Sequence, residues 1–199
     1  MRHNDPMPRI SAPTLAEHQA KRRSDVVDAA VHLLLVSGPA AVTPAAVASS
    51  AGLARSSVYQ YFPSSGALLA IAVEDAFRRT LDSLHEALVG ATTPADKISA
   101  YVDAALDGAI EGHRPMASLA GSDLPQECQQ RVVELHHELL APLVEALAEL
   151  GHADAEAQAA LVNAVLVAAA GQVVRGESAH SVHDRIRRFV LAAVSVGRP

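Results

Sequence analysis

The sequence predicts an all-α fold of about nine helices. Half of the 199 residues are apolar, and most of these are Ala, Val and Leu, of which Ala and Leu cost little to place in a helix. Apolar residues recur every three or four positions between breaks that contain Gly or Pro, which is the period of a helix with one buried face. No segment combines sustained two-residue alternation with β-branched enrichment, so the pattern predicts no strands.

Gly and Pro residues divide the expected helices. Gly38-Pro39 ends the first helix. Thr43 and Pro44 are a plausible N-cap and first helical residue for a second helix of two turns, which Gly52 ends. The expected helices cover about 16–37, 44–51, 54–62, 66–88, 94–112, a short stretch after Pro115, 125–150, 154–175 and 183–196.

Composition and hydropathy indicate the cellular compartment in which the protein is expected. The single cysteine, Cys128, rules out an internal disulfide framework and fits a reducing compartment. No run of about 18 uncharged apolar residues is present, and the N-terminal stretch lacks the apolar centre of a secretory signal. We therefore expect a cytoplasmic protein with no membrane partner.

The net charge of −6 conceals an asymmetry along the chain. Residues 1–63 hold six Lys or Arg against four Asp or Glu, whereas residues 64–199 hold ten against eighteen. A mildly basic N-terminal part on an acidic remainder is typical of a DNA-binding domain joined to a different domain. Chance variation in a short segment would give the same balance, so charge alone does not decide.

The two short helices on either side of Gly52 predict a helix-turn-helix. Helices of two or three turns are unstable alone, so we expect the first helix to complete a three-helix unit that presents the third helix outward. Val58 and Phe62 would point inward. The other side chains can reach phosphates and base edges, unless the tyrosines merely pack against the fourth helix. These are Arg55, Ser56, Ser57, Tyr59, Gln60 and Tyr61.

The segment from Arg22 to about Arg79 resembles the DNA-binding domain of the tetracycline-repressor (TetR) family of bacterial transcription regulators. The resemblance rests on "VVDAAVHLL", Gly38, Thr43, "VASSAGL" and "SSVYQYFPSSGALL", in which Tyr-x-Tyr-Phe ends the recognition helix before a break and a Leu-rich helix. We accordingly divide the chain into a mobile tail at 1–19, a helix-turn-helix DNA-binding domain at 20–65, and a ligand-binding and dimerisation domain at 66–199.

The resemblance also implies roles for single residues in binding double-stranded DNA. Both short helices and their flanks contribute. Base contacts are expected from Arg55, Ser56 and Tyr61, phosphate contacts from Ser57, Tyr59 and Thr43, and either from Gln60, with Pro44 beside Thr43.

Three positions depart from the family's pattern. Ala54 stands in place of the usual Ser or Thr N-cap, which weakens the helix start by about 1 kcal/mol. Ser65 replaces a lysine that often touches a phosphate, although the N–H groups of that helix could still bind one. Ala45 and Ala46 give little polar reach. Because few cations would contact phosphates, DNA affinity is expected to depend only weakly on salt concentration, unless Lys21, Arg22, Arg23 or the tail supply further contacts. Alternatively, those three residues could simply form a solvated start of the first helix.

The remaining helices are expected to dimerise and to bind an effector. Residues 154–196 are nearly apolar through "AEAQAALVNAVLVAAAGQVV", and a helix of this kind must be covered on most sides. Together with the resemblance, this favours a homodimer through the last two helices that reads a palindromic operator. The resemblance implies release by a small-molecule effector, with no cofactor. Candidate lining residues are Phe77, His85, Tyr101, His113, Met116, Leu119, Cys128 and His137.

The ten histidines raise one alternative, a di-metal carboxylate helical-bundle enzyme. Glu134 with His137, and Glu177 with His180, have the Glu-x-x-His spacing of such bundles. The second pair falls beside Gly176 at a helix end, and so short a motif arises easily by chance. No other catalytic constellation is visible, so the prediction is a protein that is not an enzyme.

Overall fold

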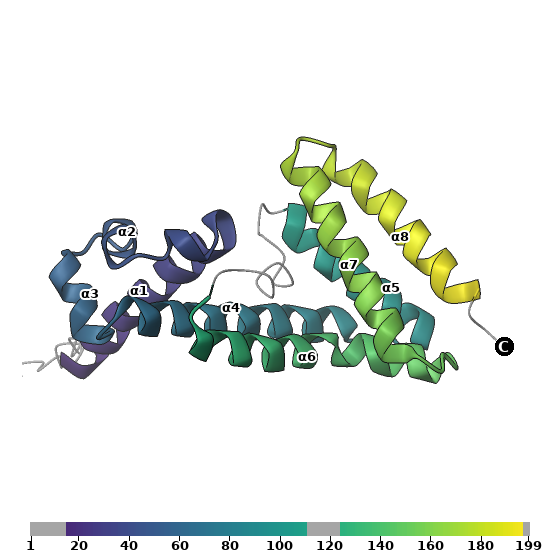
Figure 1. The fold of residues 1–199 in the computed structure, drawn as a ribbon, viewed down its shortest axis with the longest axis horizontal. Helices are drawn as coiled ribbons and strands as arrows, with labels where there is room; N and C mark the ends of the chain where they lie inside the picture. Colours follow the sequence, from purple (N-terminus) through teal and green to yellow (C-terminus); the bar gives the residue numbers. More distant parts are fainter. Residues whose placement is uncertain (1–14, 111–123, 197–199) are drawn as a thin grey trace, which may run out of the picture.

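The computed structural model describes residues 15–110 and 124–196, and this part of the chain contains eight α-helices and one short 3-10 helix. The all-α prediction is confirmed. Figure 1 shows their arrangement. The elements are α1 (Leu15–Ser37), η1 (Pro39–Ala41), α2 (Pro44–Ser50), α3 (Arg55–Tyr61), α4 (Ser65–Leu88), α5 (Pro94–Ile110), α6 (Gln126–Glu149), α7 (Ala155–Val174) and α8 (Ala179–Val196).

Helices α1 to α3 form one end of the molecule, called the head below, and pack on the first turns of α4 (Figure 1). Val26 of α1, Val47 of α2 and Leu68 of α4 are fully buried in its core. Gly52 joins α2 to α3 with a φ of 66°, a left-handed conformation that only glycine adopts at little cost. The turn therefore fixes the angle at which α3 leaves α2.

Helices α4 to α8 form the rest of the molecule, called the body below. Helix α5 lies inside it, in contact with α4, α6, α7 and α8. Helices α4 and α6 run side by side, and α4 continues into the head (Figure 1). The buried His152, after α6, lies with its Nε2 2.9 Å from the carbonyl oxygen of Val194 near the end of α8. This contact closes the far end of the body.

Helix α7 is apolar on all sides, and its outer side is not covered by this chain. By length and composition this helix could cross a membrane, and only 28% of its most apolar stretch of 18 residues is buried within the chain. One such helix is weak evidence for a membrane span, because core and interface helices have the same composition. Leu161 is 63% exposed on α7, and Phe189 is 57% exposed on the neighbouring α8.

The helix boundaries differ from the expected ones in three places. Helix α1 begins at Leu15, so residues 15–19, assigned to the mobile tail, are helical. Helix α8 begins at Ala179 and not near His183, because Val182 continues the buried stripe of that helix. Helix α4 begins at Ser65. The short helix expected after Pro115 lies outside the described residues.

Candidate functional site

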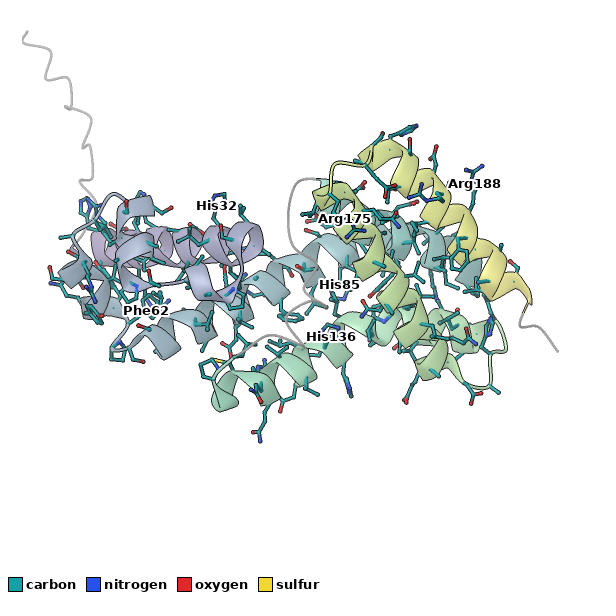
Figure 2. All side chains as sticks on the ribbon, turned by 45° about the horizontal axis from the view of Figure 1, so that its top comes forward. His32, Phe62, His85, His136, Arg175 and Arg188 are labelled. Atoms are coloured by element: carbon teal, nitrogen blue, oxygen red, sulfur yellow. The ribbon has the colours of Figure 1, made fainter. Side chains whose placement is uncertain are left out.

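The outward face of α3 is the candidate nucleic-acid interface. Val58 is 1% exposed and Phe62, directly after the helix, is buried, so these two side chains fix α3 on the head. Figure 2 labels Phe62 within the head. Ala54 precedes the helix and offers no side-chain cap. A helix of seven residues is therefore held by its apolar anchors and by the turn at Gly52.

Of the six residues on α3 that are expected to contact DNA, four are exposed and two are half-buried. Arg55, Ser56, Tyr59 and Gln60 are exposed, and Ser57 is half-buried. Tyr61 is half-buried and packs against the core of the head. The expectation that both tyrosines lie on the surface is thus wrong for Tyr61, because it sits at the end of the helix where the chain turns inward to Phe62.

Arg55 and Tyr59 form a pair on this face. The Arg55 guanidinium donates to the Tyr59 hydroxyl at 3.4 Å, and its central carbon lies 5.9 Å from the centre of the Tyr59 ring. Residues four apart in a helix are neighbours on its surface. The pair places a cation and a phenol side by side, within reach of one stretch of DNA.

The start of α1 brings further cations close to α3. The Arg23 guanidinium lies 5.2 Å from the centre of the Phe62 ring, a cation–π distance. Arg22 is exposed beside it. Lys21 pairs with Asp25 of its own helix at 2.9 Å. Arg23 therefore lies against the end of α3, whereas Lys21 is partly neutralised within α1.

Side-chain caps fix the starts of α2 and α4. The Thr43 hydroxyl accepts a hydrogen bond from the Ala46 N–H at 3.2 Å, with Pro44 at the first helical position. At α4 the N-cap is Ser64, whose hydroxyl accepts from the Ala67 N–H at 3.1 Å. Ser65, the residue named from the sequence, is exposed and is the first helical residue. The preference for serine at N-caps was the signal that would have identified Ser64.

Replacing Ser64 by alanine is expected to lower the free energy of unfolding by about 1 kcal/mol, because the Ala67 N–H loses its acceptor. The matched change Ser65→Ala is expected to alter it by less than about 0.5 kcal/mol. Urea denaturation of the two variants at one protein concentration measures the difference. Equal losses in the two variants would contradict the assignment of Ser64 as the cap.

The candidate effector residues fall into three groups. Phe77, Tyr101 and Cys128 are buried in the body, and burial raises the pKa of the Tyr101 hydroxyl well above its usual range. His85 and His137 are exposed, so the structure does not place them in the interior. His113, Met116 and Leu119 lie outside the described residues.

His136, which was not among the candidates, is half-buried and faces the interior of the body. Its ring meets that of Phe77 edge-on, with centroids 6.0 Å apart and planes at 68°. Its Nε2 lies 3.4 Å from the amide nitrogen of Asn163 on α7. Burial, and secondarily the neighbouring His137, lowers the pKa of the His136 imidazole. The helical period was the available signal, because the buried Val132 and Leu139 lie four residues before and three after His136.

A comparison with known families addresses the head. Residues 26–71, which run from α1 into α4, match the family described as bacterial regulatory proteins, tetR family. The head is a TetR-family DNA-binding domain. The resemblance inferred from the sequence is confirmed, and no curated protein matches the chain by sequence.

Solved structures extend the likeness from the TetR-type head to the whole fold. A TetR transcriptional regulator from Chloroflexus aurantiacus has a TM-score of 0.79 at 20% identity, covering 90% of this chain and 96% of its own. A TetR-family regulator from Streptomyces coelicolor gives 0.75 at 16%, covering 94% and 98%. FadR from Bacillus subtilis, solved with stearoyl-CoA, gives 0.68 at 15%, covering 84% and 97%. At these identities the likeness concerns the fold.

An ion-pair network fastens the TetR-type head to α4. Arg79 of α4 pairs with Asp28 of α1, and it also bonds Asp75 on its own helix, with Nε 2.7 Å from Oδ2. Arg78 is the second partner of Asp75. Burial raises the pKa of the Asp75 carboxyl, but the hydrogen bonds from Arg78 and Arg79 outweigh burial and leave that pKa below its usual value. The middle of α4 is therefore bound to α1 by charge as well as by packing.

The metal-site alternative gains no geometric support. Glu134 pairs with Arg131 at 2.9 Å on the surface of α6, and His137 is exposed. Glu177 and His180 are exposed around the start of α8. Within residues 15–110 and 124–196, no three His, Cys, Asp or Glu side chains are grouped so as to hold a metal ion.

Proposed function

We propose that the chain is a cytoplasmic, ligand-responsive transcriptional repressor that binds a palindromic operator as a homodimer and is released by a small-molecule effector. A TetR-family head on a TetR-like fold suggests a DNA-binding regulator that responds to a ligand. The observation that carries the proposal is the outward face of α3, where Arg55, Ser56, Tyr59 and Gln60 stand exposed on a family-matched helix-turn-helix.

The chemistry of that face supports base reading in a major groove. A guanidinium can bond both acceptors of a guanine edge, and an amide can bond both groups of an adenine edge. Arg55 and Gln60 supply these two groups. Hydroxyls and phenols, here Ser56 and Tyr59, suit phosphate oxygens or single base edges. The cap residue Thr43 and the cations of α1 flank this face and would contact the backbone.

The outer sides of α7 and α8 support a two-fold dimer. Helix α7 exposes small residues and one leucine at helical spacing, and α8 exposes Phe189 beside two arginines. Figure 1 shows α7 and α8 as neighbours, with α8 at the edge of the body. Small side chains let helices approach closely, and a self-complementary patch is what a two-fold interface requires. The α7 residues are Ala157, Ala160, Leu161, Ala164 and Ala168.

Replacing Arg55 by alanine is expected to weaken binding to the operator by about 1–3 kcal/mol and to relax discrimination at particular base pairs, because a bidentate base contact is lost. The operator is first obtained by selection from random sequences, and binding is then measured by fluorescence anisotropy near physiological salt. Arg131→Ala is the matched control, since it removes an exposed arginine from α6, a helix of the body and not of the head.

Two outcomes would contradict the proposal. If selection returned no preferred sequence, the chain would not be a sequence-specific reader. If Arg55→Ala weakened binding to all sequences equally, and no more than Arg131→Ala, then Arg55 would supply charge and not base recognition.

A further inference from the structure

The interior of the body contains a polar atom whose partner is missing. Nδ1 of His136 is buried and has no hydrogen-bond partner among the residues that the structure describes. A buried donor or acceptor left without a partner is costly, and buried polar atoms in native proteins are nearly always bonded to protein or to another molecule. This nitrogen therefore marks a place where a bonding partner other than the described residues would fit the chemistry.

Asn163 decides which kind of partner Nδ1 needs. The contact at 3.4 Å joins the Asn163 amide nitrogen to His136 Nε2, and an amide NH2 group can only donate. With the amide assigned in this orientation, Nε2 accepts and a neutral ring carries its proton on Nδ1. The unmatched group is a donor, and its partner must be an oxygen or nitrogen acceptor.

The surroundings set the charge and polarity of that partner. His136 lies at the edge of the Phe77 ring, and its buried helix neighbours Val132 and Leu139 are aliphatic. On α7, Ala159 and Leu166, one turn before and after Asn163, are buried as well. The lowered pKa of His136 keeps the ring neutral near pH 7. None of these described neighbours carries a positive charge, so a carboxylate brought here would gain no compensating charge from them.

We propose that His136 and Asn163 anchor the effector, and that the effector is an uncharged, largely apolar molecule whose carbonyl or ester oxygen accepts the Nδ1–H of His136. This rests on the proposed function and names the ligand class for it. Asn163 acts as a positioning residue that holds the tautomer of the ring. Phe77 forms one wall. Because Phe77 belongs to α4, it connects the anchor with the helix that continues into the head (Figure 1).

The first test is the tautomer of His136 in the full-length protein without ligand. Nitrogen-15 NMR of histidine-labelled protein is expected to show a neutral His136 protonated on Nδ1, titrating below the ordinary histidine value. His137→Phe assigns the neighbouring signal. A ring protonated on Nε2, or charged near neutral pH, would overturn the proposal.

The second test adds a probe of the stated class. Methyl hexyl ketone is titrated near neutral pH, with octanoate as a charged molecule of the same carbon count. The ketone is expected to bind saturably and to shift the Nδ1–H resonance, and octanoate to bind at least about tenfold more weakly. His136→Phe keeps a ring of similar size but no donor, and it is expected to weaken ketone binding about tenfold or more.

Asn163→Leu and His137→Phe separate positioning from general effects. Asn163→Leu is expected to move His136 toward the Nε2–H tautomer and to lower the affinity for the ketone. His137→Phe is expected to leave the affinity for the ketone unchanged. Equal ketone affinity in the wild type and His136→Phe would overturn the proposal. Anisotropy on the selected operator is run in parallel. Operator binding without ketone binding rejects this inference alone, and ketone binding through His136 without operator binding rejects the proposed function alone.

Discussion

Dimers carrying Leu161→Glu together with Phe189→Glu are expected to dissociate into monomers. Both side chains are apolar and more than half exposed in the single chain, and they lie on the outer sides of α7 and α8. In the proposed two-fold interface each protomer would bury both new carboxylates without a partner. Because a buried unpaired charge costs several kcal/mol, the dissociation constant is expected to rise at least about a thousandfold.

Sedimentation velocity over a range of protein concentrations measures this change, and circular dichroism confirms that the helices remain. Val133→Glu is the matched control, since Val133 is 54% exposed on α6, outside the proposed interface. Operator affinity is expected to fall in the double variant, because two linked heads bind far more tightly than one. If the double variant stayed dimeric, as the Val133→Glu control is expected to do, the dimer interface would lie elsewhere.

Phe77→Ala is expected to be the most destabilising change in the interior, with a loss of about 3–5 kcal/mol in the free energy of unfolding. The Phe77 side chain is 0% exposed, and its ring fills the contact between α4 and α6 beside His136. Its removal leaves a cavity at the point where the helix from the head joins the body. Since α4 and α6 are long helices held in place on both sides, little collapse into that cavity is possible.

Urea denaturation measures the loss in the free energy of unfolding. All variants are compared at one protein concentration, because the stability of a dimer depends on that concentration. Tyr59→Ala is the control, because Tyr59 is aromatic but 42% exposed on α3, and it is expected to change stability by less than about 1 kcal/mol. Similar losses in both variants would show that Phe77 is not a principal support of the core.

The sequence predicted the head well because its determinants are local. Thr43 and Pro44 begin α2, Gly52 ends it, and the i, i+4 pair Val58 and Phe62 orients α3. Each of these depends on residues within one or two turns. Tyr61 was misjudged because its environment depends on how the chain leaves α3, which the period of the helix alone does not fix.

The body was predicted less well because its determinants lie between helices. His136 and His137 are adjacent and chemically alike. The helical period places His136 on the buried side of α6, but its contacts with Phe77 on α4 and Asn163 on α7 depend on how the helices pack. His85 was predicted to line the effector pocket because it is a histidine, but it lies on a side of α4 that faces solvent.

The Asp28–Arg79 pair gives α4 the properties of a lever. With 24 residues, α4 is about 36 Å long at about 1.5 Å per residue, so a tilt of about 5° at the end near the body displaces the other end by about 3 Å. Because α1 is fastened to α4 at Arg79, just past the midpoint of that helix, the head follows that displacement as one piece. In a two-fold dimer both heads move, and the change in their separation, about 6 Å, exceeds the 3.4 Å step between base pairs. Phe77 lies eleven residues, or about 16 Å, from the body end of α4, so the same tilt displaces α4 there by only about 1.4 Å. In the proposed dimer, a displacement of that size beside Phe77 is enough to misplace both recognition helices on DNA.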